Sequence, residues 1–396
     1  MKFFVNRDIN FLAVHTVLMS FAEGLGTVFF TPFLLRAGLS PAQIFLAGAA
    51  ILVLRFSLRP LVLIVASAVG LRRALILGTV LSAIQFPTIA LVHGVGVTLA
   101  LFCAIASISQ VFYWTCFHTF FSSLGDIERR GSQIAIRQAF VALTGIIAPA
   151  AGGLMLISFG PWSAFSVACV VQLAAILPLL PIHQPQIVTP SPRDAFAAAR
   201  TGIRLFFADG WIRSGSATAW TIIMFQSLSA RYDNFGGTLA VATLAGALGG
   251  MVVGRVIDLG HARRSVSVSA VILAVGLILK SMCDGHPIAV VAVAIVTTAF
   301  SGFYLPYWMT AVYNESKIAP CTFRFHFASE GGSDVGGFLA SVLAAAVCAV
   351  QLPIGAVVLL ALPMIAVQAV LLDASYAAHG ARTKKRGEAY PLVEPK

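Results

Sequence analysis

Long apolar runs separated by short polar connections dominate this chain. A helix needs about 20 consecutive apolar residues to cross the hydrocarbon core of a bilayer, and most of the runs reach that length. The pattern therefore predicts twelve membrane-spanning helices. They are expected over residues 11–35, 43–68, 74–93, 97–121, 137–157, 163–181, 206–229, 238–258, 266–283, 287–312, 327–350 and 353–373.

The longest polar connection runs from His183 to Arg204 and leaves six spans on each side. We predict an N-terminal bundle over residues 1–182, a central cytoplasmic loop over 183–204 and a C-terminal bundle over 205–374. A disordered cytoplasmic tail is expected over residues 375–396. The loop segment from Arg193 to Arg200 is compatible with a short helix at the membrane surface.

Composition excludes a soluble fold. Mean hydropathy is +0.92 and 10% of the residues are charged, whereas soluble domains carry about 25%. The net charge of +11 does not indicate nucleic-acid binding, because the basic residues cluster in short connections, as in cytoplasmic loops. With both termini cytoplasmic, only Arg36, Arg231 and Lys280 fall in external loops. We expect an integral plasma-membrane protein, with a bacterial inner membrane as the first choice and a retained first helix.

The six cysteines are scattered and form no C-x-x-C pair, which predicts free thiols, no metal site and no cofactor. A Gly-Lys pair is missing from the sequence, so the chain has no phosphate-binding loop of an ATP-driven pump. The segment around Ser333 fails the serine-nucleophile pattern at Val335. We predict no catalytic residues and no enzymatic activity.

The two halves echo each other weakly. Arg72-Arg73 recur as Arg263-Arg264, an offset of 263 − 72 = 191 residues, and Tyr113-Trp114 recur as Tyr307-Trp308, an offset of 194. Two similar six-helix bundles around a central site are expected from such a repeat.

At this point the chain resembles the major facilitator superfamily of secondary transporters over essentially its whole length. The family's loop signature is similar to a segment that contains Gly254, Asp258, Arg263 and Arg264. The first-half copy keeps Gly70, Arg72 and Arg73, but Leu63 and Ser67 stand where the family usually has Gly and Asp. The resemblance therefore implies an all-α fold of two pseudo-symmetric six-helix bundles.

A second resemblance lies in the span 137–157. Gly145, Pro149, Gly152 and Gly153 are similar to a pattern that antiporters of this family often carry. Small residues let helices approach closely and a proline bends its helix. Ordinary helix packing explains the same residues, so the pattern favours export without establishing it.

The resemblance also implies that the first, fourth, seventh and tenth spans line a central cavity. Aromatic and polar side chains on these spans would suit an amphipathic, even cationic, solute. Interfacial aromatic belts are the alternative. The candidates for substrate binding are Arg55, Gln110, Tyr113, Trp114, His118, Trp220, Gln226, Tyr304, Tyr307 and Trp308. His15 and His118 are expected to relay protons or to contact lipid headgroups.

Glu23 lies near the middle of the first span, where a charge costs roughly 2.5–3.5 kcal/mol and usually marks an ion, proton or substrate path. We interpret Glu23 as a protonation switch; a structural carboxylate is the alternative. Arg55, at a similar depth, is the expected partner of Glu23. Arg59 and Asp334 match in depth, and the resemblance implies that their spans meet between the halves, so they are expected to form an ion pair, whether static or breaking during transport.

Two further possibilities concern the arginines. Arg55 and Arg59 share one helix face and would also suit an anionic substrate, which leaves the substrate's charge open. Asp209 and Arg213, four residues apart, are expected to form an intrahelical pair rather than a ligand site.

We therefore expect a secondary active transporter that works by alternating access, with Glu23 and Asp334 in proton coupling. Proton-coupled efflux of a small amphipathic compound is the first hypothesis. Proton-coupled uptake of a small metabolite or anion, or a transport-inactive receptor, are the alternatives. The expected partners are a small-molecule substrate, protons and the lipid bilayer, and the expected state is a monomer.

Overall fold

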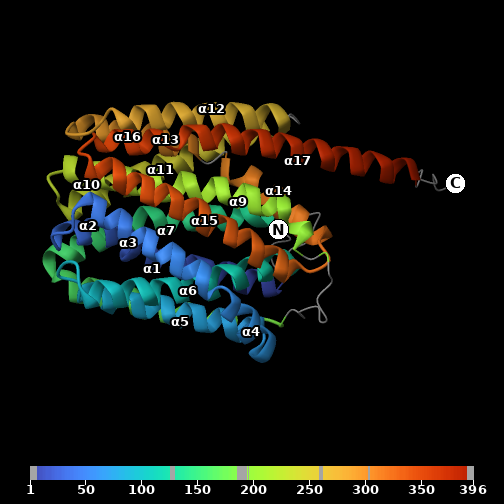
Figure 1. Ribbon diagram of the computed structural model, residues 1–396, viewed down its shortest axis with the longest axis horizontal. Helices are drawn as coiled ribbons and strands as arrows, with labels where there is room; N and C mark the ends of the chain where they lie inside the picture. Colours follow the sequence, from blue (N-terminus) through green and yellow to red (C-terminus); the bar gives the residue numbers. More distant parts are fainter. Residues whose placement is uncertain are drawn as a thin grey trace.

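The computed structural model describes residues 7–124, 130–184, 194, 196–257, 262–301 and 304–389. Within these residues the chain is helical, and short turns join long, roughly parallel helices (Figure 1). Eight helical segments are long and apolar enough to cross a membrane, and three shorter apolar helices accompany them. Large apolar side chains such as Ile64 and Val170 are exposed on the surface, as expected for a protein in contact with lipid.

The first half forms six spans that match the predicted ones. Turns and kinks divide some of them into two helices, so the half contains α1 (Arg7–Leu25), α2 (Phe30–Arg36), α3 (Pro41–Leu58), α4 (Pro60–Val69), α5 (Leu71–Ala90), α6 (Val97–Leu124), α7 (Arg130–Ser158) and α8 (Gly160–Ala174). Pro60 starts α4 directly after Arg59. A proline lacks a backbone N–H and bends the helix there, so the second span is kinked beside its two arginines.

The second half forms six more spans, also in agreement with the prediction. It contains α9 (Arg200–Ile212), the π-helical segment η6 (Arg213–Ala217), α10 (Thr218–Ser227), α11 (Tyr232–Ile257), α12 (Ala262–Ser281), α13 (Pro287–Ser301), α14 (Tyr304–Ile318), α15 (Thr322–Ala349), α16 (Ile354–Leu359) and α17 (Leu362–Ala389). Segments α9, η6 and α10 together make the seventh span.

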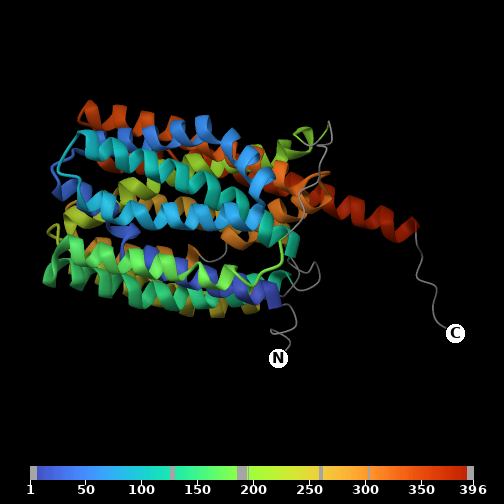
Figure 2. The ribbon, with the colours of Figure 1, turned by 90° about the horizontal axis from the view of Figure 1, so that it is seen from below.

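Two expectations about the connections need correction. The tail expected to be disordered from Ser375 continues as helix α17 to Ala389 and extends beyond the bundle (Figures 1 and 2). The surface helix expected between Arg193 and Arg200 is reduced, within the described residues, to the 3-10 turn Ala197–Ala199. That turn leads directly into α9.

The two halves lie side by side, and α1 begins at the same end of the bundle at which α17 ends (Figures 1 and 2). We call this the terminal end, and the other the far end. Between the halves, α3 packs on α15 and α7 packs on α11. Aromatic and aliphatic side chains fill two buried cores, one with Phe29 and Phe235 near the far end and one with Phe120 and Tyr313 near the terminal end.

Small residues make the contact between α7 and α11 possible. A Cβ on Gly236 would collide with the carbonyl oxygen of Pro149, and one on Gly153 would collide with the backbone of Tyr232. Gly152 lies against Leu25, and Gly145 faces Thr243. The four residues predicted for helix packing thus all lie at close helix contacts.

Two adjacent glycines of α11 test this packing. We expect Gly236→Ala to lower the free energy of unfolding by about 1–3 kcal/mol, the usual cost of overpacking. Gly237→Ala is the matched control, because a Cβ there would meet none of the described atoms within 4 Å, and alanine favours a helix over glycine. Thermal unfolding of the purified protein in detergent measures both. Equal melting temperatures of the two variants would contradict the packing.

Candidate functional site

Two arginines and two carboxylates meet where α3 of the first half crosses α15 of the second. Arg55 in the last turn of α3 and Arg59 at its C-cap face Glu330 and Asp334 of α15. All four side chains are buried near the middle of their spans. Burial of a charge in a membrane interior is costly, so these groups must satisfy one another.

The two carboxylates share the arginines. Asp334 accepts hydrogen bonds from Nε (3.0 Å) and Nη2 of Arg59, and its other oxygen lies 2.8 Å from Nε of Arg55. Glu330 accepts a hydrogen bond of 3.3 Å from Nη2 of Arg55. The expected contact between Arg59 and Asp334 is confirmed, and two cations balance two anions.

Helix α6 completes the arrangement from the first half. Gln110 accepts a hydrogen bond of 2.6 Å from Arg55, and Thr115 accepts one of 3.2 Å from Arg59. His118 places Nε2 3.3 Å from Glu330 and Nδ1 2.9 Å from the hydroxyl of Tyr313 on α14. We call Arg55, Arg59, His118, Glu330 and Asp334 the inter-half cluster.

Glu23 stands apart from the inter-half cluster. It is half-buried on α1, and among the described residues it has no hydrogen-bond or ion-pair partner. The expected pair with Arg55 is wrong, because α3 packs directly against α15 and the Arg55 guanidinium is taken by Asp334, Glu330 and Gln110. Glu23 is therefore a carboxylate in the middle of a span without a compensating cation.

The predicted histidines differ in their surroundings. His15 is buried, its Nδ1 lies 2.7 Å from the carbonyl oxygen of Ala175, and its ring packs near Tyr113. These contacts tie α1 to the end of α8 and place His15 away from lipid headgroups. His118 lies inside the inter-half cluster, stacked 5.6 Å from the ring of His326.

The predicted aromatic side chains that the structure describes do not all lie together. Tyr113 is buried, and its backbone lies against Gly78 of α5. Trp114 is half-buried and stacks on His118 at 5.5 Å. Trp308 packs edge-on against Phe206 at 5.1 Å.

Trp220 lies elsewhere, with the Lys280 ammonium 5.2 Å from its ring. The structure therefore separates it from Trp114 and Trp308. The side chains of Tyr304 and Tyr307 are outside the described residues.

The loop-motif residues are only partly described. Arg72 donates to the carbonyl oxygens of Leu180 and Ile182, at 2.9 and 3.2 Å, which links the start of α5 to the end of the sixth span. Arg73 is exposed. Gly254 lies in the last turn of α11. Asp258 lies outside the described residues, as do the side chains of Arg263 and Arg264.

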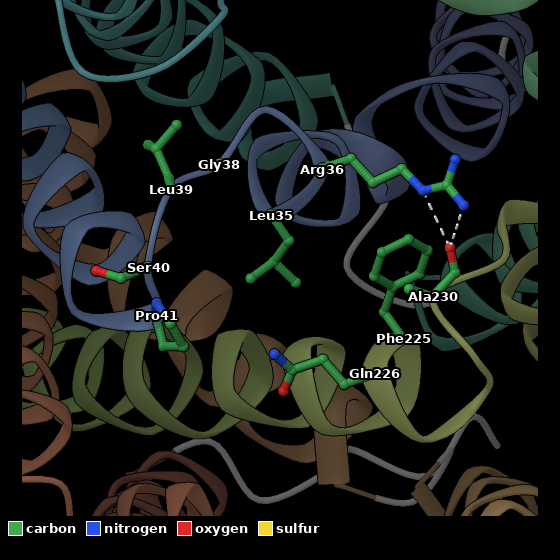
Figure 3. A pocket seen from close by; sticks show the side chains of 9 residues that line it. All are labelled: Leu35, Arg36, Gly38, Leu39, Ser40, Pro41, Phe225, Gln226 and Ala230. Carbon is green, nitrogen blue, oxygen red and sulfur yellow. Dashed lines mark hydrogen bonds between the residues drawn. The ribbon is translucent and has the colours of Figure 1, made fainter.

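At the far end the halves also touch. Figure 3 shows Arg36, at the end of α2, directed at the carbonyl oxygen of Ala230, to which it donates from Nε (3.1 Å) and Nη2 (2.8 Å). Ser229 and Ala230 have positive φ angles of 63° and 52°, which non-glycine residues rarely adopt. A cavity of about 320 Å³ opens beside this contact, lined by Leu35, Ser40, Phe225, Gln226 and others.

Glu330, Tyr313 and His326 were missed by sequence reasoning. One signal could have found Glu330. It precedes Asp334 by four residues, as Arg55 precedes Arg59, so both helices present a pair of like charges on one face. Tyr313 and His326 carry no comparable signal, because single polar residues near a span end are common.

Comparison with known proteins identifies the fold. A sequence profile described as Major Facilitator Superfamily matches residues 12–317. None of the curated protein sequences matches the chain significantly.

Solved structures share the fold at low identity. The human organic anion transporter MFSD10 has a TM-score of 0.66 and 16% identity over 92% of this chain and 99% of its own. The E. coli fucose:proton symporter FucP has a TM-score of 0.64 and 13% identity over 95% and 99%. The nucleoside transporter NupG has a TM-score of 0.61 and 14% identity over 93% and 99%.

The inter-half cluster predicts a double-mutant result. We expect Asp334→Asn to lower the free energy of unfolding by about 3–5 kcal/mol, because it leaves buried arginines without their shared anion. Adding Arg59→Gln restores the charge balance, so the double variant should be more stable than Asp334→Asn alone. Thermal unfolding in detergent measures all three proteins.

Asp233→Asn serves as the control for that experiment. Asp233 pairs with Arg231 at the surface, at 2.6 Å, and exposed pairs contribute about 0–1 kcal/mol. If Asp334→Asn were no more destabilising than Asp233→Asn, the cluster would not hold the halves together.

Proposed function

The chain belongs to the Major Facilitator Superfamily, and from this premise we propose that it is a proton-coupled secondary transporter of a small amphipathic solute. The observation that carries the proposal is the buried inter-half cluster. Alternating access requires two bundles that rock against each other around a central site. The charges of the inter-half cluster lie on helices of both halves and therefore separate when α3 moves away from α15.

The cluster limits when the halves can separate. Opposite charges attract more strongly in a medium of low dielectric constant than in water. Moving Arg59 away from Asp334 is therefore costly unless water enters, a carboxylate takes up a proton, or a ligand replaces one partner. Each of these events accompanies a step of a proton-coupled cycle. The cluster therefore couples the movement of the two bundles to proton uptake and to solute binding.

Glu23 is the proposed protonation switch. Its carboxylate lies in the middle of the first span and has no compensating cation among the described residues. Desolvation disfavours the charged form of a carboxyl group. In our proposal Glu23 carries a proton while its surroundings are closed and releases it when water reaches it. Asp334 is the second proposed coupling residue, because it holds both arginines of the cluster.

Export is one direction that this mechanism allows. The close packing of α7, where Gly152 and Gly153 touch neighbouring backbones, supports it through the resemblance to antiporters. In an antiport cycle a cationic solute and a proton would compete for Glu23. We propose both termini to be cytoplasmic and the protein to work as a monomer in the plasma membrane.

Uptake is the second candidate, and a different observation favours it. The side chain of Arg213 on the seventh span is largely exposed, and Asp209 contacts only its Nε. A partly paired cation of this kind favours an anionic solute, which Glu23 would repel when charged and accept when protonated. Solute and proton would then move in the same direction.

Glu23→Gln tests the proton switch. We expect wild-type protein in inside-out vesicles to couple proton movement to an added solute, and Glu23→Gln to lose that coupling because a glutamine cannot exchange a proton. A pH-sensitive dye follows the flux while benzylamine, benzamide and benzoate are offered as a cationic, a neutral and an anionic solute. The sign of the flux separates antiport from cotransport.

Asp233→Asn is the control, because this substitution removes a surface carboxylate and leaves the interior unchanged. Unaltered solute-dependent proton flux in Glu23→Gln would show that Glu23 is structural, and Glu330 and Asp334 would then be the carboxylates to test.

A further inference from the structure

One arginine in the membrane interior is not covered by its neighbours. The side chain of Arg213 is 68% exposed, although Ile212 directly before it and Gly215 two residues after it are buried. Arg55 and Arg59, by comparison, are 9% and 3% exposed. Arg213 therefore projects into open space at a depth where charged side chains are normally paired and covered.

The helix face that carries Arg213 points into the bundle and not to lipid. Asp209 and Phe206 precede it by four and seven residues and so share its face. Phe206 packs on Trp308 at 5.1 Å and on His118 at 6.0 Å. The opposite side of the seventh span is taken by Trp211, which donates to the carbonyl oxygen of Leu360 at 2.9 Å.

Packing places Arg213 close to the inter-half cluster. Gly210, three residues before Arg213, lies against the backbone of Ser333, the neighbour of Asp334. The charge of Arg213 and those of the cluster therefore share a region of low dielectric constant, where charges interact strongly.

The backbone at this point is unusual. Residues Arg213–Ala217 form a π-helical segment between α9 and α10. Such segments are rare in helices and frequently occur at functional sites. Ala217, one turn after Arg213, is also exposed, so the segment opens a short strip of the seventh span to the interior.

The guanidinium is only partly engaged. Its Nε lies 2.9 Å from Asp209, and Asp209 itself is buried. Both terminal nitrogens, Nη1 and Nη2, have no partner among the described residues. Two parallel N–H groups in one plane match the geometry of a carboxylate, which arginine binds through two hydrogen bonds.

We propose that Arg213 binds a carboxylate group of the transported solute. The inference rests on the proposed function and names the chemical class of its substrate, a small amphipathic organic acid. The carboxylate occupies the terminal nitrogens of Arg213, while Asp209 keeps its contact with Nε and shares the cation. Trp114, half-buried on α6 and stacked on His118, offers an apolar surface to the body of the acid.

This assignment fixes the sign of coupling at Glu23. A second negative charge in the interior opposes a charged Glu23, so a proton on Glu23 favours binding of the organic acid. Proton and acid then move together. The glycine and proline pattern of α7, by contrast, resembles that of antiporters and favours movement of proton and solute in opposite directions.

Chemical modification of arginine tests the site directly. Phenylglyoxal reacts with accessible guanidinium groups, and mass spectrometry of peptides from the full-length protein in detergent reports the modified positions. We expect Arg213 to be modified, and benzoate or decanoate to protect it while benzamide and benzylamine do not. Arg231, 55% exposed beside Asp233, is the internal control and should be modified equally under all conditions.

Three outcomes overturn the proposal. Failure of both carboxylates to protect Arg213 shows that its guanidinium is not a carboxylate site, and so does a lack of modification of Arg213. Equal protection by benzamide or benzylamine shows that binding does not depend on the carboxylate group, and this result also contradicts the proposal.

Substitutions provide an independent readout. Benzoate binding, measured by thermal shift, should weaken at least tenfold in Arg213→Gln, because a charge-assisted bond contributes roughly 1.5–3 kcal/mol and 1.4 kcal/mol is a factor of ten. Arg213→Lys keeps the charge but loses the planar fork, so it should bind more weakly than wild type and more tightly than Arg213→Gln.

Asp209→Asn removes the competing anion and should strengthen benzoate binding without affecting benzamide. A merely structural role of the pair predicts instead that Asp209→Asn and Arg213→Gln change stability alike and leave benzoate affinity unchanged. Arg231→Gln is the control for folding and net charge.

The result is separable from the proton switch. Protection of Arg213 needs neither transport nor a gradient. If Glu23→Gln kept normal proton coupling while benzoate still protected Arg213, the switch would fail and the site would stand. If Glu23→Gln lost proton coupling as expected but benzoate did not protect Arg213, the proton switch would stand and the carboxylate site would fail.

Discussion

The contact between α3 and α15 depends on a charge balance that no single residue provides. Asp334 contacts both Arg55 and Arg59 of the second span, and Glu330 joins Arg55 to His118. Removing either arginine or either carboxylate leaves an unbalanced charge in a region of low dielectric constant, where it cannot be solvated. Hydrophobic packing does not distinguish one relative position of two apolar helices sharply from another. A set of buried charges does, so the inter-half cluster fixes how the two bundles meet.

The repeat in the sequence explains where the halves touch at each end. Ser122 of α6 and Ser316 of α14 share a hydrogen bond of 2.6 Å and lie 194 residues apart. Arg36 and Ala230, in contact at the far end, are also 194 residues apart. The same offset relates Tyr113 to Tyr307. Residues that are equivalent in two halves can touch only near the axis that relates the halves, so both contacts lie close to that axis.

The same repeat relates the positions of Glu23 and Arg213 in their two halves. By the offset of 194, Glu23 corresponds to Ala217, since 217 − 23 = 194, and Ala217 ends the π-helical segment that begins at Arg213. The first half therefore places a carboxylate where the second half has a small exposed residue. The second half places an arginine one turn away. The two pseudo-symmetric halves thus carry opposite charges. In our proposal the carboxylate of the first half takes the proton, and the arginine of the second half binds the acid.

The fold was predictable to a much greater extent than the site. Twelve spans and their division at the central loop follow from apolar length, because each span must satisfy its backbone hydrogen bonds internally in lipid. The Arg59–Asp334 contact followed from matching depth together with the resemblance, which places the second and eleventh spans side by side. The partner of Arg55 did not, because depth cannot tell which neighbouring helix a side chain faces, and α15 rather than α1 lies against that face of α3. The exposure of Arg213 could not be predicted either. Its spacing from Asp209 correctly predicts an intrahelical pair, but a pair that uses only Nε leaves the rest of the guanidinium open, and exposure inside a bundle depends on how several helices pack around it.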